Sequence, residues 1–310
     1  DSLNLIHKIG MLNLFFKKPK TEIFSFLGMD FSNRLGTAAG LDKNGDYMDC
    51  LGELGFGFLE VGTITPLAQD GNPKPRVFRN FQDKSIINRL GFNNKGVDHL
   101  VKNLKSRSYK GIVGVNIGAN KKSEGEQRIK DYLLCIEKVY KYADYITVNI
   151  SSPNTPNLRD LHNANNLSNL LLSIENKAKE LKTDIPFLLK ISPDETNESI
   201  ENIIQAVEVS FFKGIIATNT TIDKTNLTNK KYKETEGGLS GKPLMNKSND
   251  KIKLIKSKSN GEIPVIGVGG VMDAEDFNKK IEAGSELVQI YTGFVIKGPN
   301  VLNEILDKND

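Results

Sequence analysis

Amide and hydroxyl side chains follow an apolar run in the stretch VNISSPNTPN, residues 148–157. Asn149 and Asn154 can donate and accept hydrogen bonds, and Ser151 and Ser152 bring hydroxyls, which are weak bases. No His, Asp or Glu lies in the stretch to activate either serine. These residue types indicate a site for a polar ligand and leave open whether a serine takes part in chemistry.

Two lysines lie where their charge needs a partner. Lys190 interrupts the apolar run PFLLKIS, and a buried ammonium without a partner is costly. We expect Lys190 to be paired in a functional site, although a lysine at a strand end can also extend to solvent. The same argument applies to Lys43 in GLDKNG, where an ordinary turn is the stronger alternative.

Glycines and further amides extend this set. The sequence GVGG at 267–270 precedes a helix-like segment, where glycines allow backbone N–H groups to approach a phosphate. Glycine is also common in ordinary turns, so this motif is weak by itself. Asparagines that can form turns or bind the imide and carbonyl groups of a ring are Asn88, Asn116, Asn149, Asn154 and Asn219.

These residues follow short apolar segments that alternate with helix-like stretches. Such an alternation is typical of a parallel sheet that is buried on both faces. Eight units of this kind predict an α/β fold, a (β/α)8 TIM barrel, with its active site at the C-terminal ends of the strands. The predicted strands are 35–39, 58–62, 112–117, 145–150, 187–191, 214–218, 264–268 and 287–291.

The predicted barrel brings the polar residues to one mouth. Each strand ends in amides, hydroxyls, glycines or a lysine, with almost no acid, which predicts a site for a polar, anionic ligand. The glycines after the seventh and eighth strands fall where barrels bind phosphate. Residues 70–92, a predicted loop and hairpin, and residues 220–241 are long connections that we expect to act as binding loops or lids.

Composition excludes several classes of protein. The 310 residues are 38% hydrophobic and 26% charged, as in a soluble globular protein, and a net charge of +4 argues against nucleic-acid binding. Cys50 and Cys135 lie far apart and predict a reducing, cytosolic setting without a disulfide. No metal site is expected, because no two histidines are spaced as a ligand pair among His7, His99 and His162.

The N-terminal segment precedes the barrel pattern, and we divide the chain into a helical segment, 1–25, and a barrel, 26–310. A lysine-rich end follows the apolar residues of the segment, and the chain begins with Asp, so we expect further sequence upstream. One helix here can lie on an anionic membrane surface or pack on its own domain. The apolar residues at helical spacing are Leu5, Ile9, Leu12 and Phe16.

Nine motifs together resemble one family, the class 2 dihydroorotate dehydrogenases, in order and spacing from about Phe26 to the C-terminus. The resemblance implies an FMN-containing barrel that oxidises dihydroorotate to orotate in pyrimidine biosynthesis and passes electrons to a membrane quinone. The motifs are AAGLDKNG, VGTITP, INRLGFNN, GVNIGAN, NISSPNTP, ATNTT, GGLSGKPL, IGVGG and QIYTGF.

The resemblance also implies residue roles. Ser152 would be the base that takes a proton from the substrate. Because a serine is a poor base, we expect Thr155, with water and packing from Phe92, to relay the proton onward. Residues that would bind dihydroorotate or orotate are Lys43, Asn88, Arg89, Leu90, Gly91, Phe92, Asn149, Asn154, Asn219 and Thr220. Residues that would bind FMN are Ala39, Gly40, Lys43, Thr63, Asn116, Asn149, Lys190, Thr218, Gly241, Gly270, Tyr291 and Thr292.

The serine at position 152 determines which class the chain resembles. Class 1 relatives have cysteine there, and this chain has neither that cysteine nor an iron–sulfur motif, which implies a quinone acceptor and no iron–sulfur partner subunit. The resemblance further implies peripheral membrane contact through the N-terminal helix, at the cytoplasmic face of a bacterial inner membrane. Asn157 replaces a glycine that is usual in relatives; because Asn tolerates a left-handed backbone, we expect the loop to keep its shape.

Two other functions remain open. Another FMN barrel that acts on a pyrimidine ring would share the cofactor, although the serine in SSPNTP argues against it. A non-redox, phosphate-binding barrel lyase would need no flavin. The colour of the purified protein, and its bleaching by dihydroorotate, separates the flavin functions from the lyase.

Overall fold

Eight parallel strands form a closed barrel in the computed structural model, which describes residues 2–151 and 164–307. The predicted (β/α)8 barrel is confirmed, and each strand overlaps its predicted range. Neighbours around the barrel are β10, β12, β13, β3, β4, β7, β8 and β9. Their bounds are β3 (Leu35–Thr37), β4 (Phe58–Ile64), β7 (Ile112–Ile117), β8 (Tyr145–Asn149), β9 (Phe187–Ile191), β10 (Gly214–Ala217), β12 (Val265–Val268) and β13 (Leu287–Ile290).

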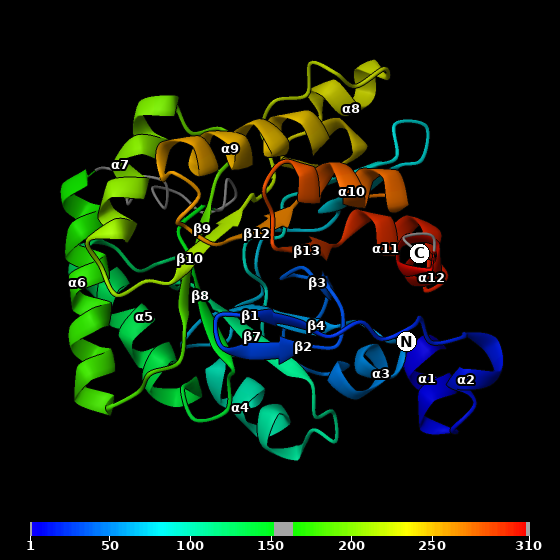
Figure 1. Ribbon diagram of the computed structural model, residues 1–310, viewed down its shortest axis with the longest axis horizontal. Helices are drawn as coiled ribbons and strands as arrows, with labels where there is room; N and C mark the ends of the chain where they lie inside the picture. The colour runs from blue at the N-terminus through cyan, green and yellow to red at the C-terminus, as the bar shows by residue number, and fades with distance from the viewer. Residues whose placement is uncertain (1, 152–163, 308–310) are drawn as a thin grey trace.

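Helices cover the outside of the barrel (Figure 1). In α7 the apolar residues recur at helical spacing and are buried, and Thr196 caps the first turn by accepting the Ser199 N–H. The helices around the barrel are α3 (Met48–Glu53), α4 (Val97–Ser106), α5 (Gly125–Val139), α6 (Ala164–Leu181), α7 (Asn197–Glu208), α9 (Met245–Lys258), α10 (Ala274–Glu282), α11 (Thr292–Lys297) and α12 (Val301–Leu306).

A hairpin closes the N-terminal end of the barrel. It consists of β1 (Phe24–Phe26) and the antiparallel β2 (Met29–Phe31). The ring of Phe31, a residue that is 1% exposed, lies edge-on to the ring of Phe58 with their centroids 5.2 Å apart. Phe58 and Tyr145 begin β4 and β8, and they belong to the same apolar cluster as Phe31. The hairpin therefore leaves the opposite end of the barrel for a ligand.

The two long connections meet in a second sheet at the carboxyl end of the barrel. The first forms the predicted hairpin, β5 (Val77–Asn80) and β6 (Ser85–Asn88). The second contains α8 (Lys230–Glu234) and β11 (Gly238–Gly241), and β11 pairs with β6. The sequence does not predict this strand pairing, which holds both connections in place. The short helix η2 (Lys242–Leu244) leads from β11 to α9.

The N-terminal segment forms two short helices, α1 (Ser2–Lys8) and α2 (Leu12–Phe15), and not the single helix that its periodicity predicts. Gly10 separates them with a φ of +70°, a conformation that interrupts a right-handed helix. The predicted apolar stripe is divided as a result, because Leu12 is buried on the barrel side whereas Leu5 is exposed.

Candidate active site

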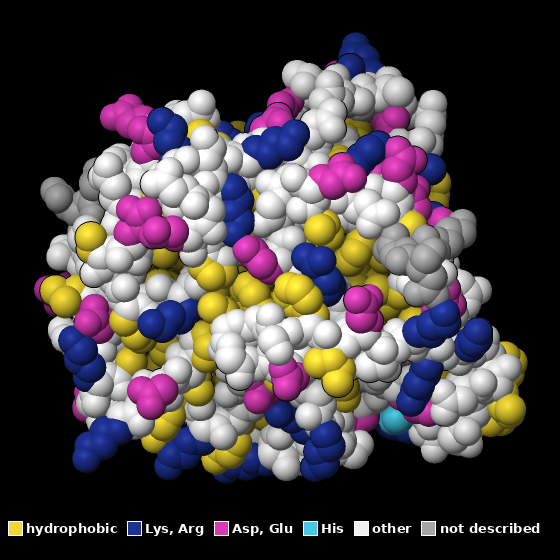
Figure 2. All heavy atoms as spheres, viewed as in Figure 1, with side chains coloured by type: hydrophobic (Ala, Val, Ile, Leu, Met, Phe, Trp, Pro, Cys, Tyr) yellow, Lys and Arg dark blue, Asp and Glu magenta, His cyan; other side chains and the backbone are white. Residues whose placement is uncertain are grey.

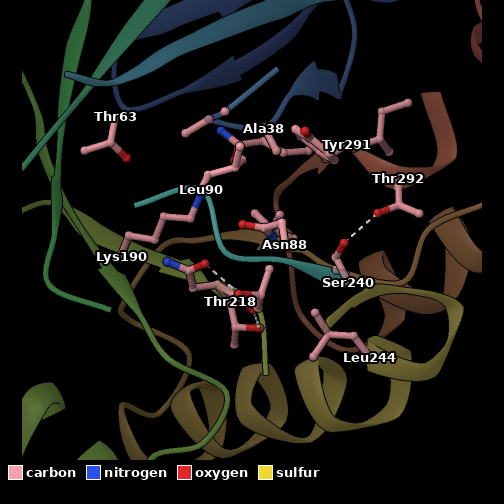
Figure 3. Close-up of a pocket in the computed structure, with 18 of the residues that line it drawn as sticks. Ala38, Thr63, Asn88, Leu90, Lys190, Thr218, Ser240, Leu244, Tyr291 and Thr292 are labelled. Carbon is pink, nitrogen blue, oxygen red and sulfur yellow. Dashed lines mark hydrogen bonds between the residues drawn. The ribbon is translucent and has the colours of Figure 1, made fainter. Parts of the chain in front are cut away.

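A pocket opens at the carboxyl ends of the barrel strands, next to β6 and β11. It encloses about 930 Å³ of space, open solvent at its mouth included. Figure 3 shows Thr63, Lys190, Thr218 and Tyr291 around one space, each from a different strand end. Predicted site residues that line it are Ala39, Gly40, Lys43, Thr63, Asn88, Leu90, Gly91, Phe92, Asn149, Lys190, Thr218, Asn219, Thr220, Gly241, Gly270, Tyr291 and Thr292.

Arg89 is among the predicted residues that the structure does not bring into the pocket wall. Its guanidinium lies over the ring of Phe78, 5.6 Å from the centroid, and forms an ion pair with Glu236 at 3.0 Å. Its neighbours Asn88 and Leu90 line the pocket, whereas its own side chain points to the other face of the loop. The predicted residues that lie outside the described part of the chain are Ser152, Asn154 and Thr155.

A chain of hydrogen bonds connects polar residues of four strand ends. Asn116, which is 0% exposed and lies behind the pocket wall, accepts from Thr63 Oγ1 at 2.6 Å. Asn149 donates to Thr63 Oγ1 at 3.0 Å and accepts from Ser151 Oγ at 2.9 Å. Asn219 donates to Ser151 Oγ at 3.0 Å. The pocket amides are thus oriented before a ligand binds, and the Ser151 hydroxyl is already engaged.

Lys43 reaches the pocket from the loop after β3. Its Nζ donates to Asn93 Oδ1 at 2.8 Å. Burial, with a smaller effect from the Arg76 guanidinium, lowers the pKa of Lys43 to about 7. Among the described residues no acid forms an ion pair with Lys43, so an anionic ligand would supply its counter-charge.

Lys190 extends into the pocket from β9 (Figure 3) and is 4% exposed. Its Nζ lies 3.8 Å from Oε1 of Glu60, which is 0% exposed. Burial lowers the pKa of Lys190, and the negative charge of Glu60 opposes this effect. The lysine therefore has the partner that its burial requires. Sequence analysis missed Glu60, although an acid inside the apolar run FLEVG was a visible signal.

Glycine backbone forms one corner of the pocket. Gly270 follows β12 with a φ of +93°, and Gly241 ends β11 with a φ of +95°. A Cβ atom would lie 2.5 Å from Met245 at the first position and 2.3 Å from the Lys84 carbonyl oxygen at the second. Any side chain would thus strain the backbone and collide with its neighbours. The bare backbone at this corner leaves room for a ligand group to approach closely.

Thr292 adds donors to this corner. It begins α11, where the first N–H groups of a helix have no acceptor within the helix. Its hydroxyl lies 2.8 Å from Ser240 Oγ, as the dashed line in Figure 3 shows. Sequence analysis missed Ser240 because the pairing of β11 with β6 carries it here. Val268 and Gly269 of the motif GVGG also line the wall, and the residues of the wall that were given no role are Ala38, Leu244, Val271, Gln289 and Ile290.

The fold and the pocket define a class of protein, a (β/α)8 barrel with a polar pocket that contains two lysines at the carboxyl end of its strands. Within residues 2–151 and 164–307, no group of three or more His, Cys, Asp or Glu could hold a metal ion. No helix in these same ranges is long and apolar enough to cross a membrane.

Comparison with known proteins identifies the family. The chain belongs to the dihydroorotate dehydrogenase family, whose model matches residues 23–309. A protein of Saccharophagus degradans named dihydroorotate dehydrogenase (quinone) is 47% identical, over 99% of this chain and 92% of its own. One of the same name from Idiomarina loihiensis is 49% identical, over 95% of this chain and 90% of its own. The crystal structure of ligand-free DHODH from Eimeria tenella is 31% identical with a TM-score of 0.90, covering 99% of this chain and 93% of that one.

Proposed function

We propose that this chain oxidises dihydroorotate to orotate in pyrimidine biosynthesis and passes the electrons to a quinone. The observation that carries the proposal is the near full-length similarity to relatives named dihydroorotate dehydrogenase (quinone). A pocket lined by amides and two lysines at the C-terminal end of the barrel supports it, because the product is an anionic ring rich in imide and carbonyl groups.

The cofactor that we propose is FMN. The glycine corner fits a phosphate, because Gly241, Gly269 and Gly270 line the pocket without side chains and leave backbone N–H groups open to approach by an anion. Lys190 fits the electron-rich edge of a flavin, because it brings a buried positive charge into the pocket. When bound, FMN supplies the acceptor for the hydride that leaves the substrate. The residues of the chain bind and orient both molecules and exclude water from them.

Substrate binding is assigned to further polar residues of the pocket wall. Lys43 has no acidic partner among the described residues, and we assign it to the carboxylate of orotate. Asn149 and Asn219 are fixed by the hydrogen-bond chain through Ser151 and present amide groups for the ring. Asn88 and Thr220, which also line the pocket, complete the described part of this site.

Ser152 is the base in this proposal, with Thr155 as a relay. The assignment of these two residues rests on the motif NISSPNTP, because both lie outside the described residues. Phe92, which we place beside the relay, is 8% exposed and lines the pocket. A serine is a poor base by itself, so the proton must pass onward through hydroxyls or water.

The replacement Ser152→Ala tests this role. We expect turnover to fall by about 10²–10⁴-fold while the flavin stays bound, because one acid–base group contributes about that factor. Ser151→Ala is the matched control, since Ser151 is fully buried, does not line the pocket and serves to orient Asn149 and Asn219. We expect a smaller loss there. Near-normal turnover in Ser152→Ala would remove this residue from the mechanism.

The N-terminal helices are proposed as a peripheral membrane contact on the cytoplasmic face, where a quinone could enter. Leu14 and Phe15 of α2 are 76% and 60% exposed, and Lys17, Lys18 and Lys20 follow them. Figure 2 shows hydrophobic side chains at the outer edge of this part of the molecule. Exposed apolar residues beside lysines suit the surface of an anionic membrane.

Two measurements test the function as a whole. The purified protein should be yellow, and dihydroorotate should bleach it in the absence of oxygen. Steady-state turnover should then be fastest with a quinone and slow with fumarate or NAD. A colourless protein that does not bind added FMN would reject the flavin reaction and leave a non-redox barrel enzyme.

A further inference from the structure

A buried carboxylate lies beneath the pocket on the inside of the barrel. Glu60 Oε2 accepts hydrogen bonds from Gln289 Nε2 at 2.7 Å and from the Tyr145 and Thr147 hydroxyls, both at 3.1 Å. Its Oε1 accepts from Asn116 Nδ2 at 2.9 Å. Glu60 does not itself line the pocket, so it can act on a ligand only through another residue.

These four hydrogen bonds fill the acceptor positions that the Glu60 carboxylate offers, which number about four. A fully buried anion also needs a nearby cation, and in the described part of the chain Lys190 is the cation within 4.0 Å.

Among the described residues, Glu60 is the acidic side chain that faces Lys190. Its register partners on the adjacent strands, Asn149 and Ile216, are not ionisable. Tyr145 is the other titratable group of the cluster, and burial together with the charge of Glu60 raises its pKa, so it stays neutral. Lys43 lines the same pocket from the loop after β3 and is a second amine, whose pKa burial lowers to about 7. Glu60 is therefore the negative charge that opposes the burial of Lys190.

We infer that Glu60 is a positioning residue that keeps Lys190 in its ammonium form, so that a bound cofactor meets a fixed positive charge. The inference rests on the proposed FMN binding and deepens it. With Lys190 already charged, two-electron reduction of a bound flavin would need one proton, and the Lys190 ammonium would offset the negative charge that remains. Without Glu60, nothing opposes the burial that lowers the pKa of Lys190. A Lys190 that has lost its proton would take one up again as that negative charge appears, which makes a second proton.

The replacement Glu60→Gln distinguishes a charged from a neutral Lys190 by the number of protons that the enzyme takes up on two-electron reduction. The midpoint potential of the bound cofactor, measured against pH, is expected to fall by about 30 mV per pH unit in the unmodified enzyme, which is one proton per two electrons. In Glu60→Gln we expect about 60 mV per pH unit near neutral pH, which is two protons. The double variant Glu60→Gln with Lys190→Met should return to one proton, because the Lys190 amine that takes up the second proton is gone.

A matched control keeps both charges. Thr147→Val removes one hydrogen bond to Glu60 and leaves the carboxylate and Lys190 in place, so its proton count should remain one. A disturbance of packing alone would change Thr147→Val and Glu60→Gln alike. Uptake of one proton per two electrons by Glu60→Gln, with Lys190 present, would overturn the inference.

A second measurement holds even where Glu60→Gln fails to fold. Nitrogen-15 NMR of lysine side chains, with Lys190 assigned through Lys190→Met, should show an ammonium in the flavin-free enzyme at pH 7.5. A neutral amine there would overturn the inference directly. A protein that takes up no flavin would end the proposed function, and this lysine measurement would still decide between a charged and a neutral Lys190.

Discussion

Lys43 changes charge within the physiological pH range, because burial lowers its pKa to about 7. Its ammonium form predominates below that pH, whereas the orotate carboxylate is ionised throughout. Above pH 7, orotate must therefore bind together with a proton. We expect its affinity to fall by up to about tenfold for each pH unit above 7, which is the limit for uptake of one proton.

Calorimetric titration with orotate at pH 8, in two buffers of different ionisation enthalpy, measures this uptake. A proton count near one is expected. Lys43→Arg supplies the control, because a guanidinium remains charged and the pH dependence should disappear. An affinity of the unmodified enzyme that is constant from pH 7 to pH 9 would exclude Lys43 from carboxylate binding.

For single residues, sequence analysis succeeded where the local pattern determines whether a side chain is buried and paired. A lysine within an apolar strand must be buried and paired, and Lys190 is both. Glu60 obeys the same logic and was overlooked, because its four donors come from strands distant in the sequence. The direction of the Arg89 side chain could not be predicted from sequence, because it depends on the tertiary contacts that Arg89 makes with Phe78 and Glu236.

The turn after β12 carries a prediction at the scale of elements. In Gly270→Ala the new Cβ would lie 2.5 Å from Met245 at a φ of +93°. Strain of this kind costs about 1–3 kcal/mol and would displace the pocket backbone, so we expect FMN affinity to fall by about 5- to 150-fold. Fluorescence titration of the flavin-free protein with FMN measures the change.

Gly261→Ala is the matched control for this turn. Gly261 has a similar φ of +80°, but a Cβ there meets nothing within 4 Å and the residue is far from the pocket wall. FMN affinity should stay within about twofold of the original, although stability falls slightly. Equal losses in the two variants would show that strain by itself, and not the shape of the pocket corner, accounts for the effect.

The helix α2 carries a second prediction at this scale. Leu14→Ser with Phe15→Ser should weaken binding to anionic phospholipid vesicles by at least about tenfold, because burying each side chain contributes about 1.5–3 kcal/mol. Co-sedimentation with vesicles measures this binding. Val209→Ser is the control, since Val209 is 87% exposed at the end of α7. Equal binding by all three proteins would place the membrane contact elsewhere.

Strands and helices were predictable because parallel strands buried on both faces read as apolar runs separated by amphipathic stretches. The pairing of β11 with β6 was not, because nothing in either segment specifies a partner so far along the chain. The break between α1 and α2 was also missed, since a single glycine is tolerated in many helical patterns and here takes a positive φ.

The stability of the whole barrel depends on its closed N-terminal end. Phe31→Ala should lower the free energy of unfolding by about 3–5 kcal/mol, because a buried ring is lost beside Phe58 and a cavity remains. Urea unfolding of the flavin-loaded enzyme measures this change. Phe81→Ala, at a ring that is 66% exposed, should change it by less than about 0.5 kcal/mol. Similar values for both would show that the hairpin does not seal the barrel.

The pairing of β13 with β3 joins the last strand of the barrel to the first. A ribosome synthesises a chain from its N-terminus at about 5–20 residues per second, so the N-terminal part emerges first. While β13 is still unmade, β3 and β12 both present open edges, which attract other chains. The mouth of the pocket also forms late, because β6 can pair with β11 only after residue 241 has left the ribosome. We therefore expect the nascent chain to need protection by chaperones until nearly its full length is synthesised, and to acquire its cofactor only after release.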